Sequence, residues 1–135
     1  MKNAIVPALF VLLLIGRAAA QTPVAARNAA KHAGETVTVC EKVFDGKLIT
    51  ASNITLLDLG GYNPNQQVVV IIRGADRNKF KGRPEIDYSG KDITVTGKVI
   101  MYKGKPGIVV QNPRQLKLVM IDNDRILRPM PVNKE

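Results

Sequence analysis

At two predicted turns of this 135-residue sequence, lysine stands beside glycine. Lys47 follows Gly46, and Lys103 and Lys105 flank Gly104. Because glycine has no side chain, the backbone there can approach a ligand closely, and the adjacent lysine can contact a phosphate. The pattern favours binding of a phosphate-bearing ligand.

Two more residues extend this candidate site. Arg73 ends a run of apolar residues, and Tyr102 stands directly before the second basic turn. The candidate nucleic-acid-binding residues are therefore Lys47, Arg73, Tyr102, Lys103 and Lys105. The alternative interpretation is that the turn lysines only keep the protein soluble and that Tyr102 covers the core.

Residues that could catalyse a reaction or hold a metal are sparse. His32 has no Cys or His neighbour at ligand spacing, and Cys40 is the sole cysteine, so no intramolecular disulfide can form. Cys40 lies in a predicted strand and is interpreted as a small apolar filler. No nucleophile-elbow or phosphate-loop pattern occurs. We expect no enzymatic activity, no cofactor and no bound metal.

Charged residues outside the candidate site have simpler interpretations. Surface solvation is the expectation for five scattered acids, with a cation site formed by two of them as the alternative. These acids are Asp58, Asp76, Glu85, Asp87 and Asp92. A basic cluster is expected at one end of the fold, away from the binding groove. It consists of Arg77, Lys79, Lys81 and Arg83.

The first twenty residues have the composition of a secretory signal peptide. A positive start, MKN, is followed by an apolar run and by Ala18-Ala19-Ala20 at the cleavage positions. An uncleaved anchor is the alternative. Cleavage near Ala20 would remove Lys2 and Arg17, which leaves 18 basic and 11 acidic residues and a net charge of +7. We expect a periplasmic or secreted basic protein without a membrane span, whose partners could be nucleic acid, anionic polysaccharide or a membrane surface.

The remaining chain is divided by pattern into three parts. Residues 21–33 are Ala-rich and predict a short N-terminal helix that Gly34 ends. Residues 34–120 carry the alternating and apolar patterns of strands. Residues 121–135 have mixed charges and two prolines, and are predicted to be a loosely ordered tail.

Two predicted strands are near-copies of each other. GETVTVCEKV (34–43) aligns with GKDITVTGKV (90–99). Between them lie a predicted hairpin turn at Asp45-Gly46, a bent second strand over 48–61, a third strand over 67–74 and a short helix over 75–80. Residues 81–90 are predicted to be a loop. A fifth strand over 108–112 and one further short strand over 116–120 complete the pattern.

The order strand, strand, strand, short helix, strand, strand is typical of a five-stranded Greek-key OB-fold barrel. In that barrel the first and fourth strands pair, so the two similar strands would lie side by side. Val37, Val39, Ile93 and Val95 should then face one core. Gly97 inside the fourth strand predicts a bulge or a sharp bend. The alternative is that two β-rich segments share valine and threonine by chance.

Three segments together resemble secreted bacterial OB-fold domains that occur alone or beside thermonuclease-type nuclease domains. The segments are TVTVCEKV, ITLLDLGGYNPNQQVVVIIRGADRNKF and GKDITVTGKVIMYKGKPGIVVQNPRQL, and the resemblance spans residues 34–118. Glu41 departs from the pattern, since glycine commonly follows the cysteine in such domains. The resemblance implies an OB barrel that binds nucleic acid, without a nuclease part.

The sequence therefore predicts an exported, non-catalytic OB-fold module that binds nucleic acid weakly through phosphates. OB barrels bind across their second and third strands, between the loops that follow strands one and four. The third strand offers no aromatic residue for base stacking, which argues against tight single-strand binding. The alternative is a periplasmic protein-interaction or envelope-stress module that binds a protein or an oligosaccharide.

Overall fold

The computed structural model describes residues 23–119, so the predicted signal peptide and the predicted tail beyond residue 120 lie outside the described residues. The strands are β1 (Thr36–Ile49), β2 (Ile54–Leu59), β3 (Val68–Ile72), β4 (Asp92–Tyr102), β5 (Lys105–Val109) and β6 (Leu116–Leu118). The helices are the 3-10 segments η1 (Ala26–His32) and η2 (Pro113–Gln115) and the short α1 (Gly74–Arg77) and α2 (Pro84–Asp87).

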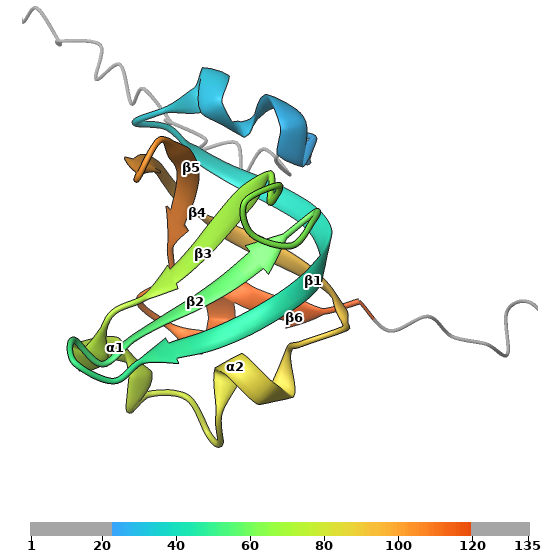
Figure 1. The fold of residues 1–135 in the computed structure, drawn as a ribbon. Helices are drawn as coiled ribbons and strands as arrows, with labels where there is room; N and C mark the ends of the chain where they lie inside the picture. The colour runs from blue at the N-terminus through green and yellow to red at the C-terminus, as the bar shows by residue number, and fades with distance from the viewer. Residues whose placement is uncertain (1–22, 120–135) are drawn as a thin grey trace, which may run out of the picture.

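Five strands close into a barrel in the order β1-β2-β3-β5-β4, and β1 pairs with β4 to complete the ring (Figure 1). The β3–β5 pair is parallel, and the other pairs are antiparallel. β6 adds to the outer edge of β4. This is the Greek-key barrel of the OB-fold, so the predicted fold class is confirmed.

The two similar strands do lie side by side. β1 and β4 are antiparallel, with Val39 opposite Val95 and Glu41 opposite Ile93. The side chains of Val37, Val39, Ile93 and Val95 are all buried in one core cluster. Two strands with the same alternation of valine and threonine thus present the same apolar face to the barrel interior.

Gly97 lies where β4 changes partner. β4 pairs with β1 up to Lys98 and with β5 from Val99 onward, so one strand serves both sides of the barrel. The β1–β4 register is regular at Gly97, which means that the strand bends there without a bulge. A Cβ atom at Gly97 would lie 2.7 Å from the backbone oxygen of Val109, so only glycine allows this close approach.

The predicted turn at Asp45-Gly46 is wrong. β1 continues through both residues with a bulge between Val43 and Asp45, and the turn falls at 50–53. Gly46 serves close packing instead, because a Cβ atom there would lie 2.2 Å from the backbone oxygen of Glu85 in α2. An Asp-Gly pair favours a turn locally, but here the glycine is needed by a tertiary contact.

Short helical segments cover the two ends of the barrel (Figure 1). η1 lies within the segment predicted to be helical, although it is a 3-10 helix, and it buries Ala26 and Ala29 in the core cluster. At the other end α1 begins one residue before the predicted helix, and α2 forms where a loop was predicted. Phe80 and Tyr88, which flank α2, contact the same core.

Two smaller expectations need correction. Cys40 is exposed and receives a hydrogen bond from the Thr94 hydroxyl at 3.7 Å, because its neighbour Val39 takes the inward position. The fifth strand begins at Lys105 and ends at Val109, earlier than predicted. Within residues 23–119, no helix has the length and hydropathy needed to cross a membrane.

Candidate nucleic-acid groove

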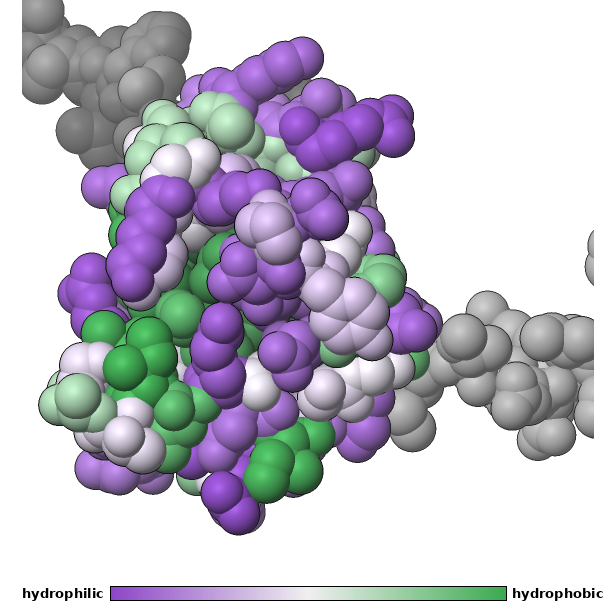
Figure 2. Space-filling model, viewed as in Figure 1, coloured by the Kyte–Doolittle hydropathy of each residue, from purple (hydrophilic) through white to green (hydrophobic). Residues whose placement is uncertain are grey.

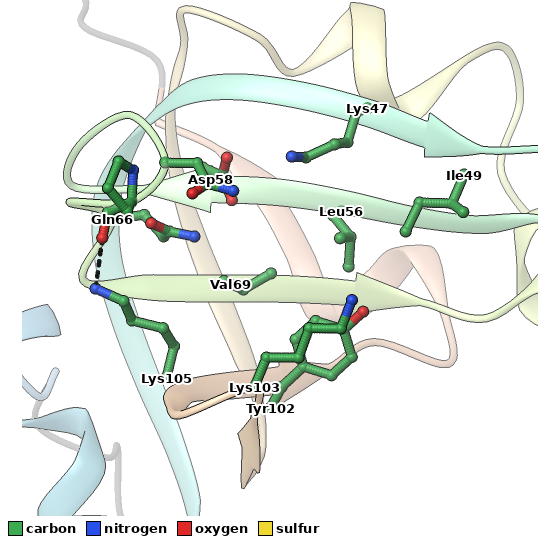
Figure 3. A pocket seen from close by; sticks show the side chains of 11 residues that line it. Lys47, Ile49, Leu56, Asp58, Gln66, Val69, Tyr102, Lys103 and Lys105 are labelled. Atoms are coloured by element: carbon green, nitrogen blue, oxygen red, sulfur yellow. Dashed lines mark hydrogen bonds between the residues drawn. The ribbon is translucent and has the colours of Figure 1, made fainter.

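A groove of about 320 Å³ lies on the outer face of β1, β2 and β3 (Figure 3). It is bounded by the β2–β3 loop and by the β4–β5 hairpin. Its lining residues are Lys47, Ile49, Leu56, Asp58, Asn63, Pro64, Gln66, Val69, Tyr102, Lys103 and Lys105. OB barrels bind their ligands on this face.

The floor of the groove is apolar. Alternate residues of β2 and β3 face outward, and Leu56, Val69 and Ile71 form a cluster separate from the barrel core. Tyr102 and three isoleucines, Ile49, Ile54 and Ile100, pack around this cluster. Figure 2 shows the same face, where apolar surface lies among hydrophilic side chains.

Lysines from three positions stand around this floor. Lys47 projects from β1, and Lys103 occupies the β4–β5 turn at φ 48° with its ammonium 5.5 Å from the centre of the Tyr102 ring. Lys105 donates a hydrogen bond to the Pro64 backbone oxygen at 2.7 Å, which ties the hairpin to the β2–β3 loop. Among the described residues, none of the three forms an ion pair with an acid.

Four of the five predicted site residues are thus brought together, and Arg73 is not. Arg73 follows β3 and precedes α1. It lines a different, more open depression together with Thr36 and Lys98. The prediction that Arg73 belongs to the same site is wrong, because the end of β3 points away from the β4–β5 hairpin that bounds the groove.

The basic cluster at the far end of the barrel is largely neutralised. Arg77 donates two hydrogen bonds to the Glu85 carboxylate at 2.6 and 2.9 Å and a third to the Thr55 hydroxyl. Lys79 pairs with Asp76 at 2.9 Å. No residue of this cluster lines the groove on the described part of the chain, as predicted.

Two acids that were expected to be solvated are buried. Glu85 is 7% exposed, and the hydrogen bonds from Arg77 lower the pKa of its carboxyl group. Asp58 is 1% exposed and lines the groove. Burial raises the pKa of the Asp58 carboxyl group, while the positive charge of Lys47 partly opposes this shift.

The β2–β3 loop supplies groove residues that the motif search missed. Asn63, Pro64 and Gln66 all line the groove. Their segment, GGYNPNQ, predicts only a loop that ends a strand. Its Gly and Pro residues indicate a loop but not the surface of the barrel against which that loop lies. Among residues 23–119, no three His, Cys, Asp or Glu side chains gather closely enough to hold a metal ion.

Comparison with known proteins adds information about the fold. The chain is similar to part of the crystal structure of an aspartyl-tRNA synthetase from Leishmania major Friedlin, with a TM-score of 0.50 and 12% sequence identity. The similarity covers 76% of this chain and 21% of the synthetase chain. No protein-family model and no curated protein matches the sequence. At this identity the likeness supports the barrel fold alone.

Proposed function

We propose that this protein is an exported, non-catalytic OB-fold module that binds nucleic acid through its phosphates. The supporting observation is the arrangement of Lys47, Lys103 and Lys105 around one groove without acidic ion-pair partners among the described residues. Lysines in this state can neutralise phosphates at little cost, because no existing ion pair must break first. The leader-like residues 1–20 support the periplasmic or secreted location.

Binding should be weak, and its phosphate contacts should not depend on sequence. Most of the affinity in such a site comes from phosphate contacts, which position the strand without reading its bases. Within residues 23–119, Tyr102 alone brings an aromatic ring into the groove. Each stacked base adds about 1–3 kcal/mol, so one ring offers limited affinity.

Two likenesses are compatible with this proposal. One is the resemblance of residues 34–118 to secreted OB-fold domains found beside thermonuclease-type nucleases. The other is the fold likeness to a protein named as a tRNA synthetase. Since OB barrels serve many functions, neither likeness assigns the ligand.

A second candidate function is an interaction module for a protein or an oligosaccharide. The observation that favours it is the apolar floor formed by Leu56, Val69 and Ile71 on the outer face. Such a floor can receive an apolar side chain or a sugar face as readily as a base. Binding that is independent of salt would favour this function over the first.

The test is a titration of the purified protein with labelled single- and double-stranded oligonucleotides at several salt concentrations. The double variant Lys47→Gln/Lys103→Gln should weaken binding to all sequences alike. It should also reduce the logarithmic salt slope by about two units at most, near one for each lost phosphate contact.

The matched control is Lys81→Gln/Lys117→Gln. It removes the same charge from exposed lysines that do not line the groove. Equal losses in both double variants would show that only net charge matters and would contradict the groove assignment. If the parent shows no salt-sensitive binding to any oligonucleotide, the nucleic-acid proposal fails.

A further inference from the structure

Two buried hydrogen-bond acceptors in the groove have no partner within residues 23–119. They are the Oδ2 atom of Asp58 and the Oε1 atom of Gln66. Asp58 is 1% exposed and Gln66 is 7% exposed, and both side chains line the groove. Buried polar groups in folded proteins are almost always hydrogen-bonded, so each unpaired acceptor calls for an explanation.

The two acceptors approach the groove from different elements. Asp58 is the outward residue of β2 that follows Ile54 and Leu56 on the same face, and it lies opposite Val69 of β3. Gln66 lies in the β2–β3 loop, two residues before β3, and Figure 3 shows both side chains at the loop end of the groove. An apolar residue at 58 would continue the apolar row, so packing alone does not favour an acid there.

Lys47 could serve as a charged partner of Asp58, but the two side chains do not form a salt bridge. No nitrogen of Lys47 is within 4.0 Å of an acidic oxygen among the described residues. Figure 3 shows its ammonium group directed along the groove toward Asp58. The lysine therefore offsets the charge of the carboxylate at a distance while leaving its hydrogen-bonding capacity unused.

A ligand that satisfies these atoms must present N–H or O–H donors. A carboxylate offers two acceptor oxygens side by side, and so prefers two adjacent donors. Among the nucleic-acid bases, the Watson–Crick edge of guanine presents two adjacent donors, N1–H and the N2 amino group. The corresponding edges of adenine, cytosine and thymine place an acceptor next to each donor. That acceptor would lie against a carboxylate oxygen, and the two would repel each other.

We propose that Asp58 and Gln66 together bind the Watson–Crick edge of an unpaired guanine in the groove. The inference rests on the proposed nucleic-acid function and adds a base preference to it. It also commits the ligand to a single strand, because pairing would occupy the same edge.

The surrounding residues are suited to this arrangement. The guanine ring would lie over the apolar floor of Leu56 and Val69, beside Tyr102. Lys47 has a flexible side chain that can turn from Asp58 toward a phosphate when the base donors take its place. In the free protein the charges of Asp58 and Lys47 offset each other. In the complex the Asp58 carboxylate receives two hydrogen bonds from the base, and the Lys47 ammonium group contacts the phosphate anion.

The first experiment changes only the ligand. A short oligothymidine with one central guanine should bind the parent protein about ten-fold more tightly than the same strand with adenine, cytosine or thymine there. Inosine at that position keeps N1–H and loses the amino group, so its affinity should lie between those of guanine and adenine. Equal affinity for all five strands, with normal salt dependence, would overturn this inference and leave the proposed function standing.

The second experiment changes the protein. Asp58→Asn should abolish the preference, so that within this variant the strand with guanine and the strand with adenine bind equally, and Gln66→Leu should reduce the preference less. Asp92→Asn is the matched control, because Asp92 is exposed at the start of β4 and does not line the groove. A guanine preference that survives in Asp58→Asn would overturn the inference. Absence of salt-sensitive binding by the parent would remove both proposals together.

Discussion

The groove and the helix-covered end of the barrel use the same residue types in opposite ways. At the helix-covered end Arg77 is held by three hydrogen bonds, two of which go to the buried carboxylate of Glu85. In the groove, Asp58 and three lysines line the same surface without an ion pair among the described residues. The charges at the helix-covered end are paired within the protein, whereas the groove lysines could still pair with a ligand.

The two buried acids show this difference most directly. The side chain of Arg77 lowers the pKa of Glu85, because its hydrogen bonds favour the charged form. Desolvation raises the pKa of Asp58, because nothing of equal strength compensates its burial. The comparison indicates that the Glu85 charge is compensated within the fold, whereas the burial of the Asp58 charge costs stability.

The largest expected effect is the loss of the buried ion pair. Arg77→Met should destabilise the protein by about 3 kcal/mol, at the low end for breaking a buried ion pair, because the buried Glu85 carboxylate keeps only the exposed Arg83, 3.5 Å away, as a charged partner. Urea denaturation at neutral pH measures this loss. The control Lys79→Met breaks the exposed pair with Asp76 and should cost about 1 kcal/mol or less.

The same pair predicts an acid-sensitive contribution in the parent. Since the folded-state pKa of Glu85 is lowered, the contribution is fully present above its ordinary value of 4.5 and is lost as the pH falls through the folded-state value. Arg77→Met should lack this loss. If both proteins lose stability equally in acid, the pair does not stabilise the helix-covered end as described.

A smaller effect is expected where α2 packs on β1. Gly46→Ala should cost about 1–3 kcal/mol, because the new Cβ atom would meet the backbone of Glu85 and shift α2. Thermal unfolding measures the change. Asp45→Ala, at the exposed neighbouring position, is the control and should change the melting temperature little. A neutral Gly46→Ala variant would mean that α2 moves freely, and that the glycine instead reflects a preference for a turn.

The smallest effect concerns Asp58 and has the opposite sign. Asp58→Asn should raise the free energy of unfolding at neutral pH, by less than the loss at Gly46, because it removes a desolvated charge. The folded-state pKa of Asp58 is raised, so the gain should shrink as the pH falls through that pKa toward the ordinary value of 3.8. Urea denaturation at several pH values gives the comparison. A variant that is less stable at neutral pH would show that Asp58 has a structural partner.

Much of the barrel was predictable from local patterns. The alternation in Thr36–Val39 and Ile93–Thr96 identified the two strands that pair, and the continuous apolar run 68–72 identified a strand buried on both faces. The basic turn was also predictable, since Lys103 and Lys105 flank a glycine in the β4–β5 hairpin. These features depend on neighbours in sequence, which is why reading the sequence recovered them.

Other features depend on residues that are distant in sequence. Whether Lys47 stands in a turn or in a strand was decided by Glu85, whose backbone occupies the space beside Gly46. Whether Arg73 joins the groove was decided by the direction in which β3 ends. A local pattern carries no information about either contact.

The sequence by itself determined the positions of most strands, the pairing of the two similar strands β1 and β4, and the excess of positive charge. Only the tertiary structure decided which charged side chains form ion pairs within the protein and which do not. The physical reason is that pairing and burial depend on distance in space. Arg77 of α1 pairs with Glu85 of α2, whereas Asp58 lies on an outward strand face in a groove whose three lysines form no ion pair among the described residues.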